Sequence, residues 1–479
     1  MNILILNPPH PTAIIREGRC QSPQNMRKTP IPQMTIAYLA GILQKGANNI
    51  KVFDCIADDL TPDNLFEKLK GFEPEISFIN TTTPSINSDL AFVRLLKAHY
   101  PHCFIATFGT HVTALHEEIM DRYDFLDCVI RHEPEWTALD IVEALKSNGI
   151  TDKGVPGCTI RYKNRIIIGE NRQYNTSLDD IGFPAWEYFD ISKYLHPVFN
   201  KPYLMVNTSR GCIHNCIFCV ASIFYGKKVR YRSIPSIIRE IKDHVIGKFG
   251  VRYIWFYADD FTYSIEFVKE LCRAIIENKI EITWWTNTRV DKPDEEMFRL
   301  MKKAGCFMLS IGGESGNETI LKNIKKGTRP EFIKNTVDIL RRVGINSLVY
   351  FLFGLPGETR ETIRETIDFA KRIKPDYVEF YPATPYPGTE FYQIACRDNS
   401  IIDENWDHYF CGGNEFVIKI SGVEKDELDT IMKKAYREFY LRPSYFLILL
   451  KRMAKPVEFM RLMNFGFTYV KRFVQEKSK

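Results

Sequence analysis

Short apolar runs alternate with helical patterns over the first 150 residues. The strand-like runs lie at 2–7, 50–53, 76–80, 103–107 and 128–131, and the helical patterns at 35–45, 89–98 and 136–146. Uninterrupted apolar runs such as NILILN (2–7) are typical of strands that are covered on both faces. This alternation predicts a doubly wound parallel sheet over residues 1–150, with a ligand crevice beyond the carboxyl ends of its strands.

A second alternating series begins at residue 203. Strand-like segments lie at 203–209, 253–258, 282–288, 307–312, 347–353 and 377–381, with amphipathic helical patterns between them. Six β/α units predict a partial (β/α)6 barrel of the TIM type within residues 201–420, with its chemistry at the carboxyl ends of the strands. Residues 151–200 contain two short β-like pieces, CTIRY and RIIIGE, and an irregular stretch. We interpret residues 151–200 as a linker that packs between the two domains.

The last segment, 421–479, reads as helices and carries the basic charge of the chain. From Leu441 to Lys479 there are nine Lys or Arg and two Asp or Glu, although the net charge of the whole chain is only +5. Aromatic residues interleaved with these cations favour peripheral contact with a membrane. A helix pair that closes the barrel with a solvated basic rim explains the pattern equally well.

The composition is that of a folded globular protein. Of the 479 residues, 45% are hydrophobic and 26% are charged. The chain length is typical of two or three domains. The start MNILILNPP lacks the features of a signal peptide, and no run approaches the roughly 18 apolar residues that cross a bilayer. Because the twelve cysteines are scattered, we expect a reducing cytoplasm, with any membrane contact peripheral at its inner face. The small net charge predicts no nucleic-acid partner.

Three cysteines stand close together directly after the first strand of the second series. Cys212, Cys216 and Cys219 are spaced by three and then two residues. Three thiolates on one loop suit three irons of a 4Fe–4S cluster and leave the fourth iron open to a small molecule. The alternative is a zinc site, which takes four ligands. No fourth cysteine is near, although His214 is available.

This CxxxCxxC pattern, with Phe218 before the last cysteine, resembles the radical S-adenosylmethionine (SAM) superfamily. The resemblance covers about Lys201 to Gly388. It implies that the three cysteines are catalytic and hold the cluster, and that SAM binds the open iron. It also implies that a flavodoxin or ferredoxin supplies an electron that cleaves SAM to a 5′-deoxyadenosyl radical, which takes hydrogen from a small-molecule substrate. Phe218 is expected near the adenine.

Later strand ends match one large branch of that superfamily, in the expected order. The residues that the resemblance assigns to the SAM region are Asp259, Asp260, Arg289, Glu314, Ser315, Gly354, Pro356 and Gly357. In this branch the position of Glu314 contacts SAM, and the loop at 354–357 contacts adenine. Carboxylates at strand ends also cap helices or turns, so a purely structural role stays open for Asp259, Asp260 and Glu314.

The N-terminal domain resembles the Rossmann-like domain of the cobalamin-binding subgroup. Its matching features are the segments 7–9, 39–43, 108–113 and 131–135, with Asp54 after the second strand. The resemblance places cobalamin in a crevice that includes Thr82, Ser85, Gly109 and His111. The Asp-x-His-x-x-Gly motif that ligates cobalt is absent, and His132 stands where the subgroup has glycine, so a narrower crevice is expected. The alternative is a domain that recognises the substrate or shapes the barrel mouth.

The leading hypothesis is a cobalamin-dependent radical SAM methyltransferase that acts on an unactivated carbon. Tails similar to residues 421–479 occur in relatives that act on lipids, which favours an apolar or lipid-like substrate. The alternatives are a radical SAM oxidoreductase, cyclase or rearrangement enzyme without methyl transfer, and a binding module with an iron–sulphur cluster. A methylthiotransferase is disfavoured because the N-terminal domain has no extra cysteine trio.

Overall fold

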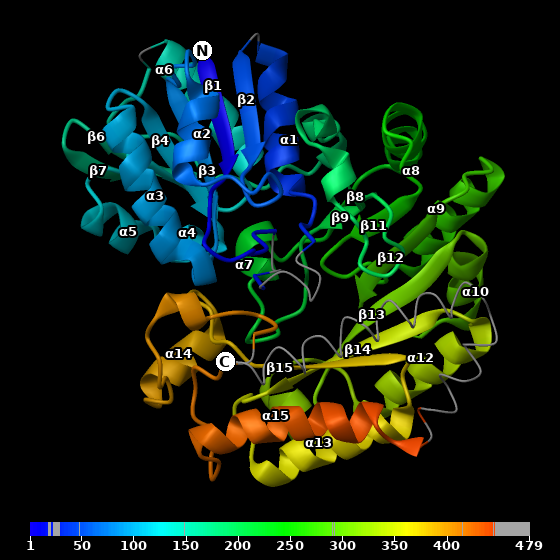
Figure 1. Cartoon of the computed structure of the whole chain (residues 1–479). Coiled ribbons are helices and arrows are strands. Elements are labelled where there is room, and N and C mark those ends of the chain that lie inside the picture. Colours follow the sequence, from blue (N-terminus) through cyan, green and yellow to red (C-terminus); the bar gives the residue numbers. More distant parts are fainter. Residues whose placement is uncertain are drawn as a thin grey trace.

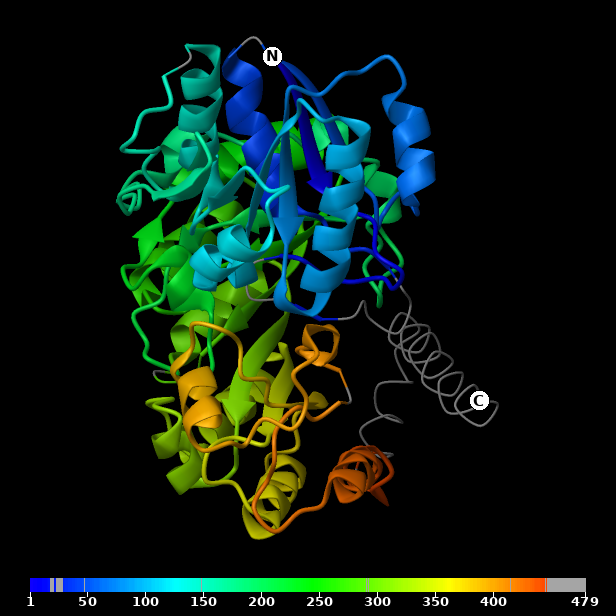
Figure 2. The same ribbon diagram turned by 90° about the vertical axis from the view of Figure 1, so that its left-hand side faces the viewer.

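The computed structural model describes residues 1–17, 21–22, 29–46, 48–147, 149–289, 291, 293–413, 415–443 and 445. The tail from residue 446 onward, on which the membrane hypothesis rests, lies outside the described residues. Two α/β units are visible in Figure 1: an N-terminal unit in blue and cyan, and a larger unit in green and yellow. The view in Figure 2 shows the same two units stacked one above the other.

The N-terminal unit is built on a sheet whose first five strands are parallel, in the order β2-β1-β3-β4-β5. These strands are β1 (Asn2–Asn7), β2 (Asn49–Asp54), β3 (Ile76–Thr81), β4 (Phe104–Gly109) and β5 (Cys128–Ile130). The helices are α1 (Met34–Leu43), α2 (Pro62–Leu69), α3 (Ile86–His99), α4 (Thr110–Ala114), α5 (His116–Arg122) and α6 (Pro134–Lys146). The doubly wound sheet expected from the apolar runs is confirmed.

Alternation along β1 explains why both faces of this sheet are covered. Ile3 and Ile5 belong to a core shared with α1 and α6, whereas Leu4 and Leu6 belong to a core shared with α2, α3 and α5. Since successive side chains of a strand point to opposite faces, a strand buried on both sides is apolar at every position.

Two further strands extend this sheet beyond the expected limit of the domain. The strands β6 (Cys158–Tyr162) and β7 (Arg165–Ile168) add antiparallel to β5, giving the order β2-β1-β3-β4-β5-β6-β7. The CTIRY and RIIIGE pieces therefore belong to the N-terminal sheet. The sequence analysis had assigned them to the linker. A hairpin pattern does not say which sheet edge it pairs with, because that pairing depends on segments distant in sequence.

The second unit is an open, all-parallel barrel sheet with strand order β15-β14-β13-β12-β11-β8. Its strands are β8 (Tyr203–Asn207), β11 (Tyr253–Tyr257), β12 (Thr283–Thr288), β13 (Cys306–Glu314), β14 (Asn346–Phe353) and β15 (Tyr377–Pro382). The helices are α7 (Ala221–Tyr225), α8 (Ile234–Arg239), α9 (Ile265–Glu277), α10 (Glu295–Lys303), α11 (Glu318–Asn323), α12 (Pro330–Val343), α13 (Arg360–Ile373), α14 (Glu390–Arg397) and α15 (Lys425–Tyr440). Six parallel strands alternating with helices confirm the partial barrel.

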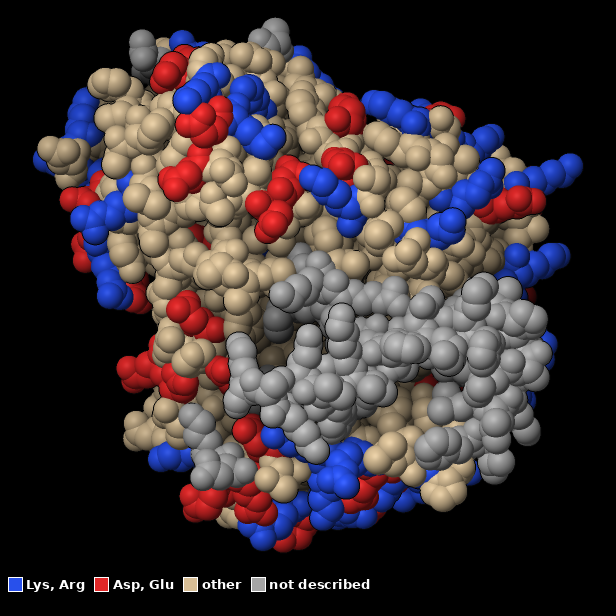
Figure 3. All heavy atoms as spheres, in the orientation of Figure 1, with Lys and Arg blue, Asp and Glu red and all other residues tan. Residues whose placement is uncertain are grey.

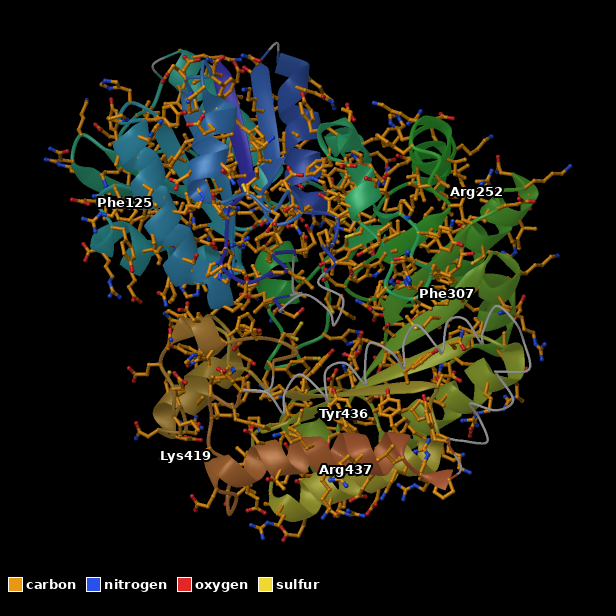
Figure 4. All side chains as sticks on the ribbon, viewed as in Figure 1. Phe125, Arg252, Phe307, Lys419, Tyr436 and Arg437 are labelled. Atoms are coloured by element: carbon orange, nitrogen blue, oxygen red, sulfur yellow. The ribbon has the colours of Figure 1, made fainter. Side chains whose placement is uncertain are left out.

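The segment 169–202 lies between the two units and closes the barrel at the amino-terminal ends of its strands. Leu178 and Trp186 pack in one core with Met34 of α1 and with the barrel helices. At the start of the barrel strands, the ring of His196 lies 4.4 Å from that of Trp285 and 5.7 Å from that of Phe307, which Figure 4 shows among the barrel strands. Because this end is filled with rings, the chemistry is left to the opposite, carboxyl end.

Helix α15 protects the free edge of the barrel sheet with tyrosine hydroxyls. Tyr436 accepts a hydrogen bond from the backbone N–H of Phe380 and donates to its carbonyl, both at 3.1 Å. Tyr440 does the same for Val378, at 3.0 and 2.8 Å, and Figure 4 shows Tyr436 between α15 and β15. An edge strand otherwise exposes unpaired backbone groups that promote aggregation.

Charged side chains of both signs are mixed on the face drawn in Figure 3, including the lower edge where α13 and α15 lie. There Glu438 pairs with Arg364 and with Lys371, both at 2.7 Å. Within the described ranges, no helix has the length and apolar content needed to span a membrane.

Candidate active site

The cysteine loop leaves the barrel through a small hairpin. After β8, the chain forms β9 (Ser209–Arg210), which pairs antiparallel with β10 (Arg230–Tyr231). Gly211 has a φ of +92°, and a side chain there would meet the carbonyl of Lys228 at 2.2 Å, so only glycine fits this turn. The N–H of Gly211 donates to Asp259 at 2.9 Å. The loop therefore starts from a tightly determined position at the carboxyl end of β8.

Arg289 touches the middle cysteine. Its guanidinium donates to Sγ of Cys216 at 3.2 Å, to Asp291 at 2.8 Å and to the carbonyl of Lys326. Burial opposes the charge of Arg289, but the sulphur of Cys216 and the carboxylate of Asp291 raise its pKa above the ordinary value. Arg289 thus joins the cysteine loop to the segments that carry Asp291 and Lys326.

His214, on the cysteine loop, lies close to two carboxylates that follow the next two barrel strands, Asp260 after β11 and Asp291 after β12. His214 lies between Cys212 and Cys216, and its Nε2 is 3.2 Å from Asp260 and 3.8 Å from Asp291. Oδ1 of Asp260 is buried and has no hydrogen-bond partner among the described residues. The helix that follows, α9, is capped by Ser264 and not by either aspartate. Asp259 and Asp260 thus hold the cysteine loop, which the capping alternative did not anticipate.

Glu314 occupies a strained position at the end of β13. Its φ is +58°, and the pairing with β14 slips by one residue between Gly312 and Glu314, as in a β-bulge. Its carboxylate pairs with Lys326 at 2.6 Å, and both side chains are buried. The Lys326 ammonium lies 6.0 Å from the ring centre of Phe218. A left-handed non-glycine residue costs free energy, and such residues occur both in turns and at functional sites.

The loop after β14 is organised around a buried carboxyl group. Glu358 accepts hydrogen bonds from the N–H groups of Gly354 and Leu355, at 2.5 and 3.1 Å, while its other oxygen has no partner in the described structure. Burial raises the pKa of Glu358 to about 8. Gly354 and Gly357 have φ values of +100° and +85°. Glu358, which the sequence analysis did not single out, thus determines the shape of the loop expected to contact adenine.

Ser315 is directed away from this group of side chains. Its hydroxyl lies 3.1 Å from that of Thr366 on α13 and accepts from the N–H of Asn317. The side chain is fully buried against the helix. The structure therefore shows a contact between strand and helix at Ser315, while it gathers Cys216, Arg289, Glu314 and Phe218 around Lys326.

The three cysteines of the loop differ in burial: Cys212 is buried, whereas Cys216 and Cys219 are partly exposed. Cys212 is buried, which raises the pKa of its thiol to about 12, so binding iron there requires release of a proton. None of the eleven cysteines that the structure describes forms a disulfide. No three His, Cys, Asp or Glu side chains of the described ranges are grouped closely enough to hold one metal ion. In a 4Fe–4S cluster each cysteine binds its own iron, so the thiolates do not converge on one point.

The expected cobalamin crevice is lined by buried polar groups at the ends of β3 and β4. Thr82 donates to the side-chain carbonyl of Gln21 at 2.5 Å. Gly109 has a φ of +134°, and a Cβ there would lie 1.9 Å from the carbonyl of Thr81. Ser85 bonds with Asp89 at 2.5 Å and accepts from Arg16 at 3.0 Å, so its hydroxyl supports the crevice from below.

Four polar groups of this crevice lack partners, as expected for a polar ligand site. The atoms are Nδ1 of His111, Oγ1 of Thr107, Oγ1 of Thr110 and Nε2 of Gln21, all buried and without hydrogen-bond partners in the described part of the chain. Burial lowers the pKa of His111 to about 3, so its ring is neutral. Unpaired buried polar groups are costly. The amide-rich rim of cobalamin fits such a donor and acceptor set, so the residues present fit the group.

Two departures from the cobalamin-binding subgroup have structural explanations. Asp54 is held by Asn7 at 2.6 Å and by the Tyr194 hydroxyl at 2.9 Å, which fixes the chain where the cobalt-ligating motif would begin. His132 has a φ of +65°, a conformation for which glycine is the easiest residue. Nδ1 of His132 lies 2.7 Å from the carbonyl of Ile223 on α7. His132 therefore contacts the barrel unit.

Sequence reasoning missed several residues of this region. Trp406 comes from the segment between α14 and α15, yet its ring lies 5.1 Å from that of His111. Arg210 and Glu135 form a buried pair across the two units at 2.7 Å. The only sequence signal for Arg210 was its place two residues before Cys212. Nothing local marks Trp406, because its partner is almost 300 residues away.

Comparison with known proteins agrees with this geometry. Residues 206–370 match the Radical SAM superfamily. Over 443 residues the chain is 31% identical to "Uncharacterized methyltransferase PH0819" from Pyrococcus horikoshii, covering 92% of this chain and 93% of the relative. The chain belongs to the radical SAM superfamily. Its cofactors are therefore a 4Fe–4S cluster and SAM, and the recognition made from the cysteine motif is confirmed.

Other similarities extend over both units of this radical SAM enzyme. It is 26% identical to the anaerobic magnesium-protoporphyrin IX monomethyl ester cyclase of Rubrivivax gelatinosus, over 86% of this chain and 74% of the relative. The solved structure of the cobalamin-dependent SAM radical enzyme OxsB, with aqua-cobalamin and SAM bound, superposes with a TM-score of 0.74 at 14% identity. The match covers 96% of this chain and 72% of that one. At this identity the likeness shows a shared fold.

Proposed function

We propose that this radical SAM enzyme uses cobalamin to methylate an unactivated carbon of an apolar small molecule. The observation that carries the proposal is the adjacency of the two candidate cofactor sites. Helix α7, which starts two residues after Cys219, packs against α4, which contains His111. His132, in the loop between β5 and α6, also contacts α7 through the carbonyl of Ile223. These contacts support a cobalamin site beside the cysteine loop.

In this proposal Cys212, Cys216 and Cys219 bind the cluster. When bound, the cluster with SAM supplies a radical that removes hydrogen, and cobalamin supplies a methyl group. Arg289 holds Cys216 in place through the 3.2 Å contact with its sulphur. Glu314, supported by Lys326, offers a fixed carboxylate for the polar end of SAM, and the loop of Gly354, Pro356 and Gly357 receives the adenine.

The inner face of the barrel sheet supports an apolar substrate. Trp255 of β11 stacks on Trp285 of β12, with ring centres 6.3 Å apart and planes at 21°, and Trp285 in turn packs on His196 at the closed end of the barrel. Across the sheet, Tyr350 and Tyr381 are stacked at 5.8 Å and 24°. The strand between the two pairs, β13, contributes small residues to this face, such as Ser310. Aromatic rings favour large, weakly polar ligands, which includes the lipid-like class.

The test begins with the anaerobically purified protein. After reconstitution with iron, sulphide and hydroxocobalamin and removal of unbound material, about four irons and one cobalt per chain are expected. Incubation with SAM carrying a deuterated methyl group and a reductant of the flavodoxin class should then give 5′-deoxyadenosine and a labelled product. The Cys216→Ala variant should fold normally but form no 5′-deoxyadenosine. Wild-type turnover by that variant would refute the cluster assignment.

A second candidate function is a radical reaction without methyl transfer, such as cyclisation. It is favoured by the similarity to the magnesium-protoporphyrin ester cyclase over most of the chain. Iron without retained cobalt, together with SAM cleavage and an unlabelled product, would select this candidate.

The basic segment from Leu441 onward is proposed to bind anionic membranes. Its support is the charge surplus counted from the sequence. Sedimentation with phosphatidylglycerol vesicles should be lost on removal of residues 446–479. Equal sedimentation of the truncated protein would refute the contact.

A further inference from the structure

A group of buried charges joins the two units at the base of the cysteine loop. Arg210 on β9 and Arg230 on β10 are directly paired in the small hairpin that leads to the loop. Both side chains are only 3% exposed. The hairpin thus buries the two guanidinium groups, and neither β9 nor β10 contains a carboxylate that could pair with them.

The carboxylates come from the N-terminal unit. Glu133 is the N-cap residue of α6, and Glu135 lies in its first turn. The Arg230 guanidinium donates to both oxygens of Glu133, at 2.5 and 3.0 Å, and Arg210 donates to Glu135 at 2.7 Å. Arg210 also lies 3.8 Å from Glu133. The acidic pair of the segment 131–135 therefore binds the barrel hairpin.

Aromatic rings complete the enclosure of Arg210. Its guanidinium lies 5.3 Å from the ring centre of Tyr38 on α1 and 5.5 Å from that of Tyr225 on α7. Glu17, which accepts from Thr35 at 2.6 Å, adds a third acidic group nearby. Residues of α1, α6 and α7 thus surround the Arg210 guanidinium.

Such a buried arrangement determines geometry more than it adds stability. Removing two charges from water costs about as much as their attraction returns, whereas leaving one charge without its partner is strongly unfavourable. The relative placement of α6 and β9 that pairs both arginines is therefore much preferred over neighbouring placements. Short, directional contacts between cation and carboxylate restrict that placement further.

We propose that the Glu135–Arg210 pair, supported by Glu133–Arg230, is a positioning device that holds the cysteine loop at one distance from the N-terminal crevice. This inference rests on the proposed function, because its consequence is the alignment of two cofactors. Arg210 is two residues from Cys212, and the intervening Gly211 is itself held by Asp259. A shift at Arg210 is therefore transmitted to the first cluster ligand. These four charged residues position the sites and take no part in bond making.

The test compares two glutamate-to-glutamine variants of the reconstituted holoenzyme. Glu135→Gln removes the short ion pair of Arg210 at the boundary between units and leaves it only the 3.8 Å approach to Glu133. The matched control, Glu240→Gln, leaves the equally buried Arg232 without its carboxylate, but both members of that pair belong to the barrel unit. Both variants disturb a buried ion pair, but only Glu135→Gln removes a carboxylate that reaches the barrel from the N-terminal unit.

The decisive readout is magnetic. The reduced cluster and cob(II)alamin are both paramagnetic, and the cluster accelerates the spin relaxation of cob(II)alamin with a steep dependence on their separation. Wild type and Glu240→Gln should show one relaxation rate. Glu135→Gln should show a spread of rates at least about twofold wide, and its labelled product per 5′-deoxyadenosine should fall about tenfold because misplacement by about 1 Å is enough to uncouple transfer.

Other outcomes overturn the inference or separate it from the proposed function. Relaxation and product ratio in Glu135→Gln equal to those of Glu240→Gln would refute positioning. If wild type retains iron but no cobalt, the proposed function fails, and hydrogen exchange of residues 208–231 becomes the test. Exchange there should be at least about fivefold faster in Glu135→Gln than in the control; equal exchange refutes the inference. If Glu135→Gln does not fold, Glu135→Asp, which keeps the charge but shortens the reach, takes its place in each measurement.

Discussion

The buried carboxyl group of Glu358 makes a quantitative prediction about pH and stability. Because burial raises the pKa of Glu358 from 4.5 to about 8, the folded protein keeps this group protonated at pH 6, whereas the unfolded chain ionises it. Folding therefore takes up a proton between pH 4.5 and 8. The stability contributed by the neutral group is complete below pH 4.5 and is lost as the pH rises through about 8.

The perturbation is Glu358→Gln. A glutamine amide oxygen can accept the same two hydrogen bonds from Gly354 and Leu355, but the side chain cannot ionise. The difference between 8 and 4.5 is 3.5 pKa units, which at about 1.36 kcal/mol per unit sets an upper bound of about 5 kcal/mol. Because buried sites respond as if partly solvated, we expect the variant to gain about 2 kcal/mol or more over wild type between pH 5 and pH 8.

The assay is urea unfolding of the cluster-free proteins at pH 5, 6.5 and 8, followed by tryptophan fluorescence. Other buried groups, such as Glu17, whose pKa burial raises to about 7, titrate equally in both proteins and cancel in the difference. The control Glu270→Gln changes an exposed residue of α9 and should shift stability equally at every pH. A difference between Glu358→Gln and wild type that does not vary with pH would show that the carboxyl group is ionised in the fold, and the reasoning would be wrong.

Three further predictions concern the backbone hydrogen bonds of β15, the room for a side chain at Gly109, and the contacts that hold the cysteine loop. Tyr436→Phe and Tyr440→Phe should each cost about 1–3 kcal/mol in urea unfolding, because N–H and carbonyl groups of β15 lose their partners; unchanged midpoints would contradict the edge-capping role. Gly109→Ala should cost more than about 3 kcal/mol, since its Cβ would lie 1.9 Å from a carbonyl. Gly71→Ala, left-handed but in open space, should cost only about 1 kcal/mol, and equal costs would refute the steric argument. Arg289→Lys keeps the charge but cannot span its three partners, so the iron retained after desalting should fall while circular dichroism stays unchanged; full iron retention would exclude a role in holding the loop.

Local patterns predicted the elements well where burial alternates simply. The apolar run at 2–7 became β1 with matching limits, and the strand-like segment 377–381 became β15. Period and run length report which faces of an element are covered, and that information is local. The cysteine spacing likewise identified the superfamily, because three ligands on one loop are a local arrangement.

Pairings between distant segments were beyond the sequence patterns. The hairpin of β6 and β7 reads the same whether it stands alone or extends the sheet through β5. The aspartates after β11 fitted either a SAM-region role or a helix cap, and the structure shows that they hold the cysteine loop. In both cases the partner is chosen by packing of whole units, which no single window of sequence contains.

The sequence by itself determined the two α/β units, the order of their strands along the chain and the three cysteines on one loop, since each follows from short-range periodicity and spacing. Only the tertiary structure decided which charges meet. It paired Glu135 with Arg210 and placed Trp406 on His111. The physical reason is that a buried charge or ring requires a partner but does not specify where in the chain that partner lies.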